Sequence, residues 1–289
     1  MTKSIEAVRQ DNGLWTVNTI ETTVEKDVVC TIKDKIVPPP VVTPPTTNVL
    51  FYDDFSSMDL KKSMNGIFWS SSNAGSGDKL PVITRECLYR GKPSLKFTFG
   101  GGPLTDAAWC EQRLKLPNLA EFWMQFYRYY PNGIESPSLG PKWVHRKGII
   151  GENNKFVVFW SGPYQGYGTT IGISTWANSG RDVFYPTIGS NQGLEAGQHG
   201  LPSVAPQDDS TLGRWVKINI HCKTATAMNN DGILQMWEDD VIKMDNKALP
   251  IYPKDGLLNA FTEGYLMGYA NSGFDQTTYC YWADVKISD

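Results

Sequence analysis

The 289-residue chain is long enough to bury a substantial core, in one large all-β domain or in two smaller domains. Its 12% aromatic content, 27 glycines and 18 prolines are typical of a folded, turn-rich all-β protein and exclude an intrinsically disordered one. The net charge of −3 gives no electrostatic reason to bind nucleic acid or an anionic membrane, because phosphate binding needs a concentrated basic surface.

The N-terminal segment, MTKSIEAVRQDNGLW, lacks the apolar region of a signal peptide. Nowhere in the chain do about 18 apolar residues follow one another, so no membrane-spanning helix is predicted. We therefore expect a protein that is made in a cytoplasm without an export signal.

The N-terminal part of the sequence is predicted to be a separate β arm. Residues 14–37 alternate Thr, Val and Ile in the manner of strands, after a turn signal, DNG. Residues 38–47, PPPVVTPPTT, are half proline, which favours a stiff and extended spacer. These patterns divide the chain into an arm at residues 1–37, a linker at 38–48 and a head domain at 49–289.

An arm of this length is too short to sustain its own core, and it has no disulfide or metal to stabilise it. Two interpretations remain open. The arm adds strands to another chain or oligomerises, or it packs back on its own head as a strand pair. We favour the first, so the expected partner of residues 1–37 is a virion or other assembly protein, and a homo-oligomer is a further expectation.

The head is predicted to be an antiparallel sandwich or jelly roll, because short apolar or alternating runs recur between turn residues and no helical period lasts three turns. Residues 176–212 hold few strand-like runs and many Gly, Asn, Gln and Pro residues, so we expect a long loop there. The clearest strand signals are SLKFTF (94–99), KFVVFW (155–160), TTIGIST (169–175), RWVKINIH (214–221), GILQMWE (232–238) and YCYWADVKI (279–287).

The five cysteines have no metal-ligand spacing, so we expect buried reduced thiols. They are Cys30, Cys87, Cys110, Cys222 and Cys280.

Charges, amides and rings interrupt two strand-like runs within residues 109–131. Because side chains alternate between the two sides of a strand, parity separates a core face from an outer face. The side chains expected in the core are Cys110, Gln112, Leu114, Leu116, Phe122, Met124 and Phe126. The outward side chains then include Trp109, Glu111, Arg113, Trp123, Gln125 and Tyr127.

These outward side chains predict a glycan-binding surface. Rings beside carboxylate, guanidinium and amide groups can stack on sugar faces while hydrogen-bonding sugar hydroxyls. A second core layer or an ordinary solvated face is the alternative, because aromatic residues favour strands whatever their function.

Residues 50–289 resemble the concanavalin A-like lectin/glucanase jelly rolls, and within them the polysaccharide-lyase-like branch. The resemblance rests on the order and spacing of FYDDFSS (51–57), EQRLKL (111–116), NNKFVVFWSG (153–162), GRWVKINIH (213–221), NDGILQMWEDDVIKMDN (230–246) and YLMGYANSGFDQTTYCYWADVKIS (265–288). It implies a two-sheet antiparallel jelly roll whose concave sheet forms a groove for a glycan chain.

Lyase members of this group cleave uronic-acid polysaccharides by β-elimination, which needs a group to neutralise the substrate carboxylate, a base and an acid. The resemblance offers Gln112, Arg113 or Gln125 for neutralisation. It offers Tyr127 or His199 as base or acid, and it adds Lys155 to the glycan-binding residues as a group for acidic sugars. No histidine lies in an alignable catalytic motif, so a surface or structural role is expected for His145, His199 and His221.

Two groups of acidic residues have other interpretations. WEDD at 237–240 has the residue types of a glucanase carboxylate pair but is predicted to be a hairpin turn, which disfavours a hydrolase. Asp53, Asp54 and Asp284 lie near the two ends of the head, which pair in this family, and some members hold a structural Ca²⁺ there. Turn capping by exposed aspartates is the alternative.

Three functions therefore remain for the head. The arm, the spacer and the missing export signal favour a non-catalytic glycan-binding or decorating protein displayed on a larger assembly, such as the capsid, fibre or baseplate of a phage virion. A polysaccharide lyase and a purely structural subunit are the alternatives. No nucleic acid or membrane partner is expected, and no cofactor is required beyond the candidate Ca²⁺.

Overall fold

We analysed a computed structural model of the chain. It describes residues 2–9, 15–22, 48–75, 78–101, 108–134, 139–144, 153–161, 169–178, 181–190, 209–226, 231–249, 251, 259–271 and 273–289. The chain forms two compact units, Met1–Pro40 and Val41–Asp289, and each is considered by itself. The division between them falls within the predicted linker.

The first unit contains an antiparallel pair of strands, β1 (Thr2–Arg9) and β2 (Trp15–Thr22). Arg9 pairs with Trp15 at the closed end, and Thr2 pairs with Thr22 at the open end. The chain therefore reverses direction between Arg9 and Trp15, and the predicted DNG turn lies in this interval, outside the described residues.

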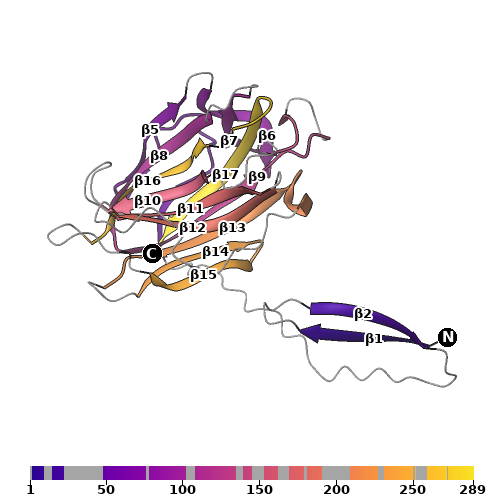
Figure 1. The fold of residues 1–289 in the computed structure, drawn as a ribbon. Helices are drawn as coiled ribbons and strands as arrows, with labels where there is room; N and C mark the ends of the chain where they lie inside the picture. The colour runs from indigo at the N-terminus through magenta and orange to yellow at the C-terminus, as the bar shows by residue number, and fades with distance from the viewer. Residues whose placement is uncertain are drawn as a thin grey trace. The chain divides into compact units, whose positions relative to one another are not determined.

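The second unit consists of two antiparallel sheets. Figure 1 shows β5, β8, β16, β10, β11 and β12 side by side in one of them. In spatial order this seven-stranded sheet contains β12 (Arg181–Ser190), β11 (Thr169–Asn178), β10 (Asn153–Ser161), β16 (Phe261–Ala270), β8 (Ala108–Leu119), β5 (Ile67–Ala74) and β4 (Ser63–Met64). The eight-stranded sheet contains β15 (Val241–Leu249), β14 (Gly232–Glu238), β13 (Trp215–Lys223), β9 (Glu121–Tyr129), β17 (Thr278–Ser288), β7 (Lys92–Phe99) and β6 (Lys79–Tyr89), with β3 (Val49–Asp53) paired to β17.

One hydrophobic core lies between the sheets, and it receives alternate side chains from both. Phe122 and Phe126 on β9 meet Phe159 and Phe156 on β10, with ring centroids 4.9 and 5.9 Å apart. All seven side chains that parity places in the core are buried there, Gln112 included. The predicted two-sheet jelly roll is therefore confirmed, and the alternation of β8 and β9 is its cause.

The chain crosses from one sheet to the other between β8 and β9. Asn118 adopts a left-handed φ of 59° at the end of β8, and only Ala120 separates the two strands. Asparagine tolerates this conformation better than most residues. Because consecutive strands enter opposite sheets, their outward side chains face opposite sides of the sandwich.

The structure corrects the loop expected at residues 176–212. Residues 181–190 form β12, the edge strand of the seven-stranded sheet, with Pro186 opposite Ile173. A proline inside a run weakens a strand prediction, but an edge strand tolerates the missing N–H. The same region holds one short 3₁₀ turn, η2 (Asp209–Thr211).

The predicted turn at WEDD and the predicted buried thiols are confirmed within the described residues. Asp239 and Asp240 of WEDD form the two-residue turn between β14 and β15, with φ of 47° and 67°. The four cysteines within the described residues are buried and form no disulfide with one another, whereas Cys30 lies outside those residues. In the described part of the chain, no helix has the length and apolar character needed to cross a bilayer.

Candidate functional site

The seven predicted glycan-binding residues divide between the two outer faces of the sandwich. Trp109, Glu111 and Arg113 on β8 and Lys155 on β10 belong to the outer face of the seven-stranded sheet, which we call the seven-strand face. Trp123, Gln125 and Tyr127 on β9 belong to the outer face of the eight-stranded sheet, the eight-strand face. The expectation of one continuous surface is therefore wrong, because β8 and β9 lie in different sheets.

The seven-strand face has an aromatic floor. Tyr265 on β16 lies between Arg113 on β8 and Val158 on β10 in the strand register. Trp160, Tyr265 and Val158 form a buried cluster separate from the main core, with the two rings 5.5 Å apart. The guanidinium carbon of Arg113 lies 5.6 Å from the centroid of Trp160 and 6.0 Å from that of Tyr265. A charged group is thus held over a buried aromatic cluster.

Alternating charges extend across this floor. Arg113 Nε donates to Glu111 Oε1 at 2.6 Å, and its Nη1 lies 3.8 Å from Glu263 Oε1. Glu111 also accepts a hydrogen bond from Asn73 Nδ2 at 2.8 Å, and Glu263 pairs with Lys115. Since Glu111 and Glu263 are almost fully buried, these ion pairs compensate their desolvation and fix the guanidinium in place.

Lys155 brings a group with a perturbed pKa to this face. A bulge in β10 places Phe156 and Val157 in the core, so Lys155 lies on the outer side. Burial disfavours the ammonium and lowers the pKa of Lys155 from 10.5 to about 8. A substantial fraction of the amine is therefore neutral just above neutral pH, which suits a general base.

Gly268 allows Lys155 and Tyr265 to lie together. A Cβ atom at Gly268 would lie 2.7 Å from Tyr265 Cε2 and 3.1 Å from Lys155 Cβ, so only glycine fits between them. The φ of Gly268 is 132°, and the preceding Met267 has a φ of 60° in mid-strand. Such strained backbone beside a perturbed lysine is common at functional sites, where the surrounding fold enforces it.

A second aromatic pair extends the seven-strand face along β8 and β16. Trp109 and Tyr269 are opposite each other in the register and stack with centroids 4.8 Å apart and an interplanar angle of 12°. Tyr269 is 43% exposed, which leaves one ring available to a ligand. The indole Nε1 of Trp109 is buried and has no hydrogen-bond partner.

The eight-strand face is packed internally. Trp123 stacks on His221 at 4.2 Å and on Trp237 at 5.4 Å. The His221 ring nitrogens contact Gln235 Oε1 at 2.9 Å and Glu121 Oε1 at 2.8 Å. This histidine is therefore a satisfied structural residue, as predicted, whereas His145 and His199 lie outside the described residues.

Two other residues considered for lyase chemistry are also remote from the seven-strand face. Tyr127 stacks on Tyr89 with centroids 4.1 Å apart, on the opposite side of the sandwich from Lys155. Gln112 lies on the core side of β8, where its side chain bonds Ser72 Oγ at 2.5 Å and the Ser71 carbonyl at 2.9 Å. The proposed roles of Tyr127 and Gln112 therefore do not fit one shared site with Arg113 and Lys155.

The three aspartates considered for calcium each have a different partner. Asp53 accepts hydrogen bonds from Trp69 Nε1 at 2.7 Å and from the Phe55 backbone, and burial raises the pKa of its carboxyl. Asp54 pairs with Lys92 at 2.6 Å, and Asp284 accepts a hydrogen bond from Tyr52. Within the described residues no three His, Cys, Asp or Glu side chains gather as metal ligands, so these aspartates do not fit a calcium cage.

Comparison with known proteins gives a fold and no family. No protein-family model matches the sequence, and no curated protein sequence matches it. The endo-β-1,4-glucuronan lyase from Trichoderma reesei is similar with a TM-score of 0.55 and 14% identity, over 83% of this chain and 95% of that one. Alginate lyase vAL-1 from Chlorella virus gives a TM-score of 0.53 and 16% identity, over 84% and 100%.

Alginate lyase Aly36B is a third similar structure, with a TM-score of 0.51 and 14% identity over 75% of this chain and 86% of that one. That structure is a variant in complex with alginate tetrasaccharide, and alanine replaces one lysine and one tyrosine in it. These similarities establish that the second unit has the jelly-roll fold of such polysaccharide lyases.

Tyr265, Trp160 and Glu263 belong to the seven-strand face but were not singled out from the sequence. Tyr265 and Tyr269 have the same parity within YLMGYA, so alternation alone could have placed them on one face. Parity within KFVVFW, by contrast, is obscured by the bulge after Lys155. The available signal was Gly268, because a glycine inside an apolar strand run often marks a bulge or a close approach of another group to the backbone.

Proposed function

We propose that the seven-strand face binds an acidic polysaccharide and cleaves it by β-elimination. The observation that carries this proposal is Lys155, whose pKa burial lowers to about 8 and whose Cβ lies 3.1 Å from the position of a Cβ at Gly268, which is itself 2.7 Å from the Tyr265 ring. The guanidinium carbon of Arg113 lies 6.0 Å from the centroid of the same ring. Arg113 and Lys115 pair with Glu111 and Glu263, so these four charges balance. The guanidinium of Arg113 is the group offered to the carboxylate of an acidic chain.

Each side chain has a separate task in this reaction. The neutral amine of Lys155 removes the C5 proton, the electron pair forms the C4–C5 double bond, and the bond from C4 to the leaving oxygen breaks. The hydroxyl of Tyr265 donates the proton that this oxygen gains; the proton on Lys155 then returns to solvent, and Tyr265 takes a proton from solvent. Arg113 offsets charge on the substrate carboxylate, which raises the acidity of the C5 proton.

The similar structures support this proposal at the level of the fold. Two of them are alginate lyases and one is a glucuronan lyase, and alginate and glucuronan are uronic-acid polymers. The Aly36B complex with alginate tetrasaccharide lacks one lysine and one tyrosine side chain, and the seven-strand face presents one lysine beside one tyrosine. Lyase activity thus becomes the leading hypothesis, and non-catalytic glycan binding by the same face becomes the alternative.

The test is formation of the unsaturated product from alginate and glucuronan, followed by its ultraviolet absorbance. Lys155→Ala should lower the rate by about 100-fold or more, because it removes the base. Lys155→Arg is the matched variant, since it keeps the positive charge and cannot act as a base near neutral pH. It should retain the polysaccharide in affinity electrophoresis while losing activity.

The pH profile tests the same assignment. The active form of Lys155 is the neutral amine, so the rate should fall about tenfold for each pH unit below 8 and reach a plateau above it. A flat profile between pH 6 and 9 would contradict the role of Lys155. If no uronic-acid polymer yields an unsaturated product but the seven-strand face still retains it, non-catalytic binding replaces the lyase.

We also propose that the Met1–Pro40 unit attaches the protein to a larger assembly, such as a virion surface, after synthesis in a cytoplasm. Support comes from the two units of the chain, because a lone two-stranded hairpin is marginally stable and gains stability by adding to another sheet. Deleting residues 1–47 should leave a folded head that no longer co-purifies with the native particle. Retained attachment of the truncated protein would contradict this role.

A further inference from the structure

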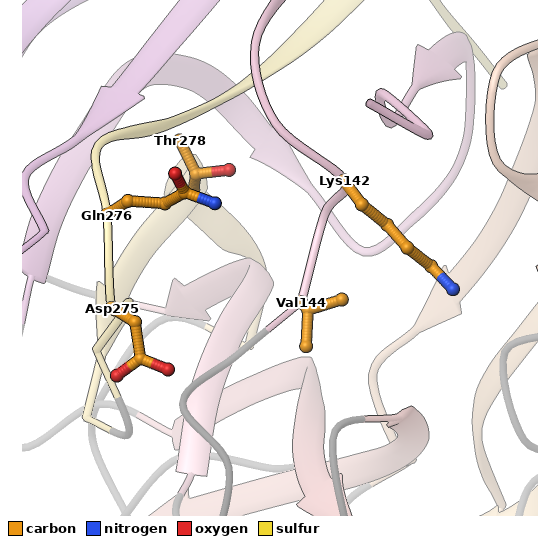
Figure 2. A pocket seen from close by; sticks show the side chains of 5 residues that line it. All are labelled: Lys142, Val144, Asp275, Gln276 and Thr278. Carbon is orange, nitrogen blue, oxygen red and sulfur yellow. The ribbon is translucent and has the colours of Figure 1, made fainter. Parts of the chain in front are cut away.

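A separate pocket of about 220 Å³ lies between two chain segments that the seven-strand face does not include. Its lining residues are Lys142, Val144, Asp275, Gln276 and Thr278. Figure 2 shows Gln276 and Thr278 on one wall, with Val144 and Lys142 on the opposite wall. The ammonium of Lys142 and the carboxylate of Asp275 are directed away from Thr278 in this view, so the charges lie toward the rim.

Both walls are anchored to the core by aromatic side chains. Trp143, between the two lining residues of its segment, is buried and stacks on Tyr130 with centroids 4.3 Å apart. Phe274, next to Asp275, is also buried and contacts Trp143 at 5.0 Å. These contacts tie the two segments to each other, so the walls are preorganised before any ligand binds.

The wall of Gln276 is also fixed from behind. A Cβ atom at Gly101 would lie 1.9 Å from the carbonyl carbon of Gln276, so the two backbones approach as closely as only glycine permits. This close approach holds the backbone of Gln276, and hence the base of its amide side chain, at one position in the pocket.

Thr278 provides the observation that points to a ligand. Its side chain is only 2% exposed, and its hydroxyl is buried without a hydrogen-bond partner among the residues that the structure describes. Buried hydroxyls are normally satisfied, since an unmade hydrogen bond destabilises the folded state. A hydroxyl left unsatisfied in the wall of a preformed pocket is explained by a ligand that supplies the missing partner.

We infer that this pocket binds one neutral sugar residue. The volume suits a single pyranose ring, and the inner wall combines the Thr278 hydroxyl, the Gln276 amide and the apolar side chain of Val144. A pyranose presents hydroxyls to the two polar groups and its C–H face to Val144, the combination used in most sugar sites. The pocket is a second glycan site that shares no lining residue with the seven-strand face.

Ligand-observed saturation-transfer NMR on the full-length protein tests this site with methyl glycosides of glucose, galactose and mannose. At least one glycoside should give a signal with the wild-type protein. Thr278→Val should remove that signal while the melting temperature stays the same or rises, because valine has the same shape and no unsatisfied hydroxyl. Gln276→Ala should weaken binding at least tenfold.

Two matched controls separate this site from the proposed lyase site. Thr277→Val changes the exposed neighbour of Thr278 and should leave the signal unchanged. Lys155→Ala should also leave it unchanged, whether or not the seven-strand face is catalytic. Absence of a signal from all three glycosides, or an equal signal with the Thr278→Val variant, would overturn the sugar pocket without affecting the lyase proposal.

Discussion

The two outer faces of the sandwich begin from the same sequence pattern and differ in what their polar groups contact. On the seven-strand face, Lys155 has a lowered pKa, and Arg113 is oriented by two buried carboxylates. On the eight-strand face, the His221 ring is satisfied on both sides, and Trp123 stacks on it and on Trp237. Rings and polar groups in alternation therefore identify an outward face, whereas perturbed charge identifies the face suited to chemistry.

Both sheets contain bulges, and they differ in which side chains lie beside the bulges. The seven-strand face has a bulge in β10 and left-handed backbone at Met267 and Gly268. In the eight-stranded sheet, the pairing of β9 with β13 is regular, and that of β9 with β17 shifts between Ala283 and Lys286. Bulges re-aim side chains, so they can bring Lys155 and Tyr265 together where a regular ladder would not.

Among the variants that compare the two faces, Gly268→Ala should lower the cleavage rate the most. Its Cβ would lie 2.7 Å from the Tyr265 ring and would displace it or Lys155. Displacement of a reacting group by about 1 Å costs about 100-fold in rate, which product absorbance would measure. Gly91→Ala is the matched control, because Gly91 has a φ of 78° but no atom within 4 Å of the added Cβ. Equal activity of the two variants would show that the contact with Lys155 and Tyr265 is irrelevant.

Trp123→Ala, on the eight-strand face, should lower stability and leave cleavage unchanged. The substitution removes a ring stacked on His221 and Trp237, so we expect the free energy of unfolding to fall by about 2–3 kcal/mol. Cleavage per folded molecule should not change, because Trp123 lies on the opposite side of the sandwich from Lys155. Urea denaturation and a rate normalised to folded protein measure the two effects. Lost activity at full stability would instead assign Trp123 to the substrate.

Much of the fold follows from local patterns. Alternation in β8 and β9 predicted which side chains enter the core, and the two aspartates of WEDD predicted the turn between β14 and β15. The edge strand β12 was missed because Pro186 suggests a loop, and only its position at the sheet edge makes the proline acceptable.

The site was less predictable, because it depends on pairing between distant strands. Trp109, Glu111, Arg113 and Lys155 were found as individual residues, but no local signal shows that β8 and β9 enter different sheets. The importance of Tyr265 depends on its position between Arg113 and Val158, which the register of three strands determines. The lowered pKa of Lys155 depends on burial, which a sequence pattern does not report.

The smallest expected effect is a change in KM, which a comparison of one lysine on each face would measure. Lys115 pairs with Glu263 on the seven-strand face, and Lys217 pairs with Asp240 at 2.6 Å on the eight-strand face. Both lysines are partly exposed, and Glu263 keeps Arg113 as a second cation, so replacing either lysine by alanine should cost at most about 1 kcal/mol of stability. Only Lys115→Ala should raise KM for an acidic polysaccharide, by about threefold, because it removes one positive charge from the binding face. A rise in KM that is equal for both variants would indicate that the overall charge of the protein, and not the seven-strand face, attracts the substrate.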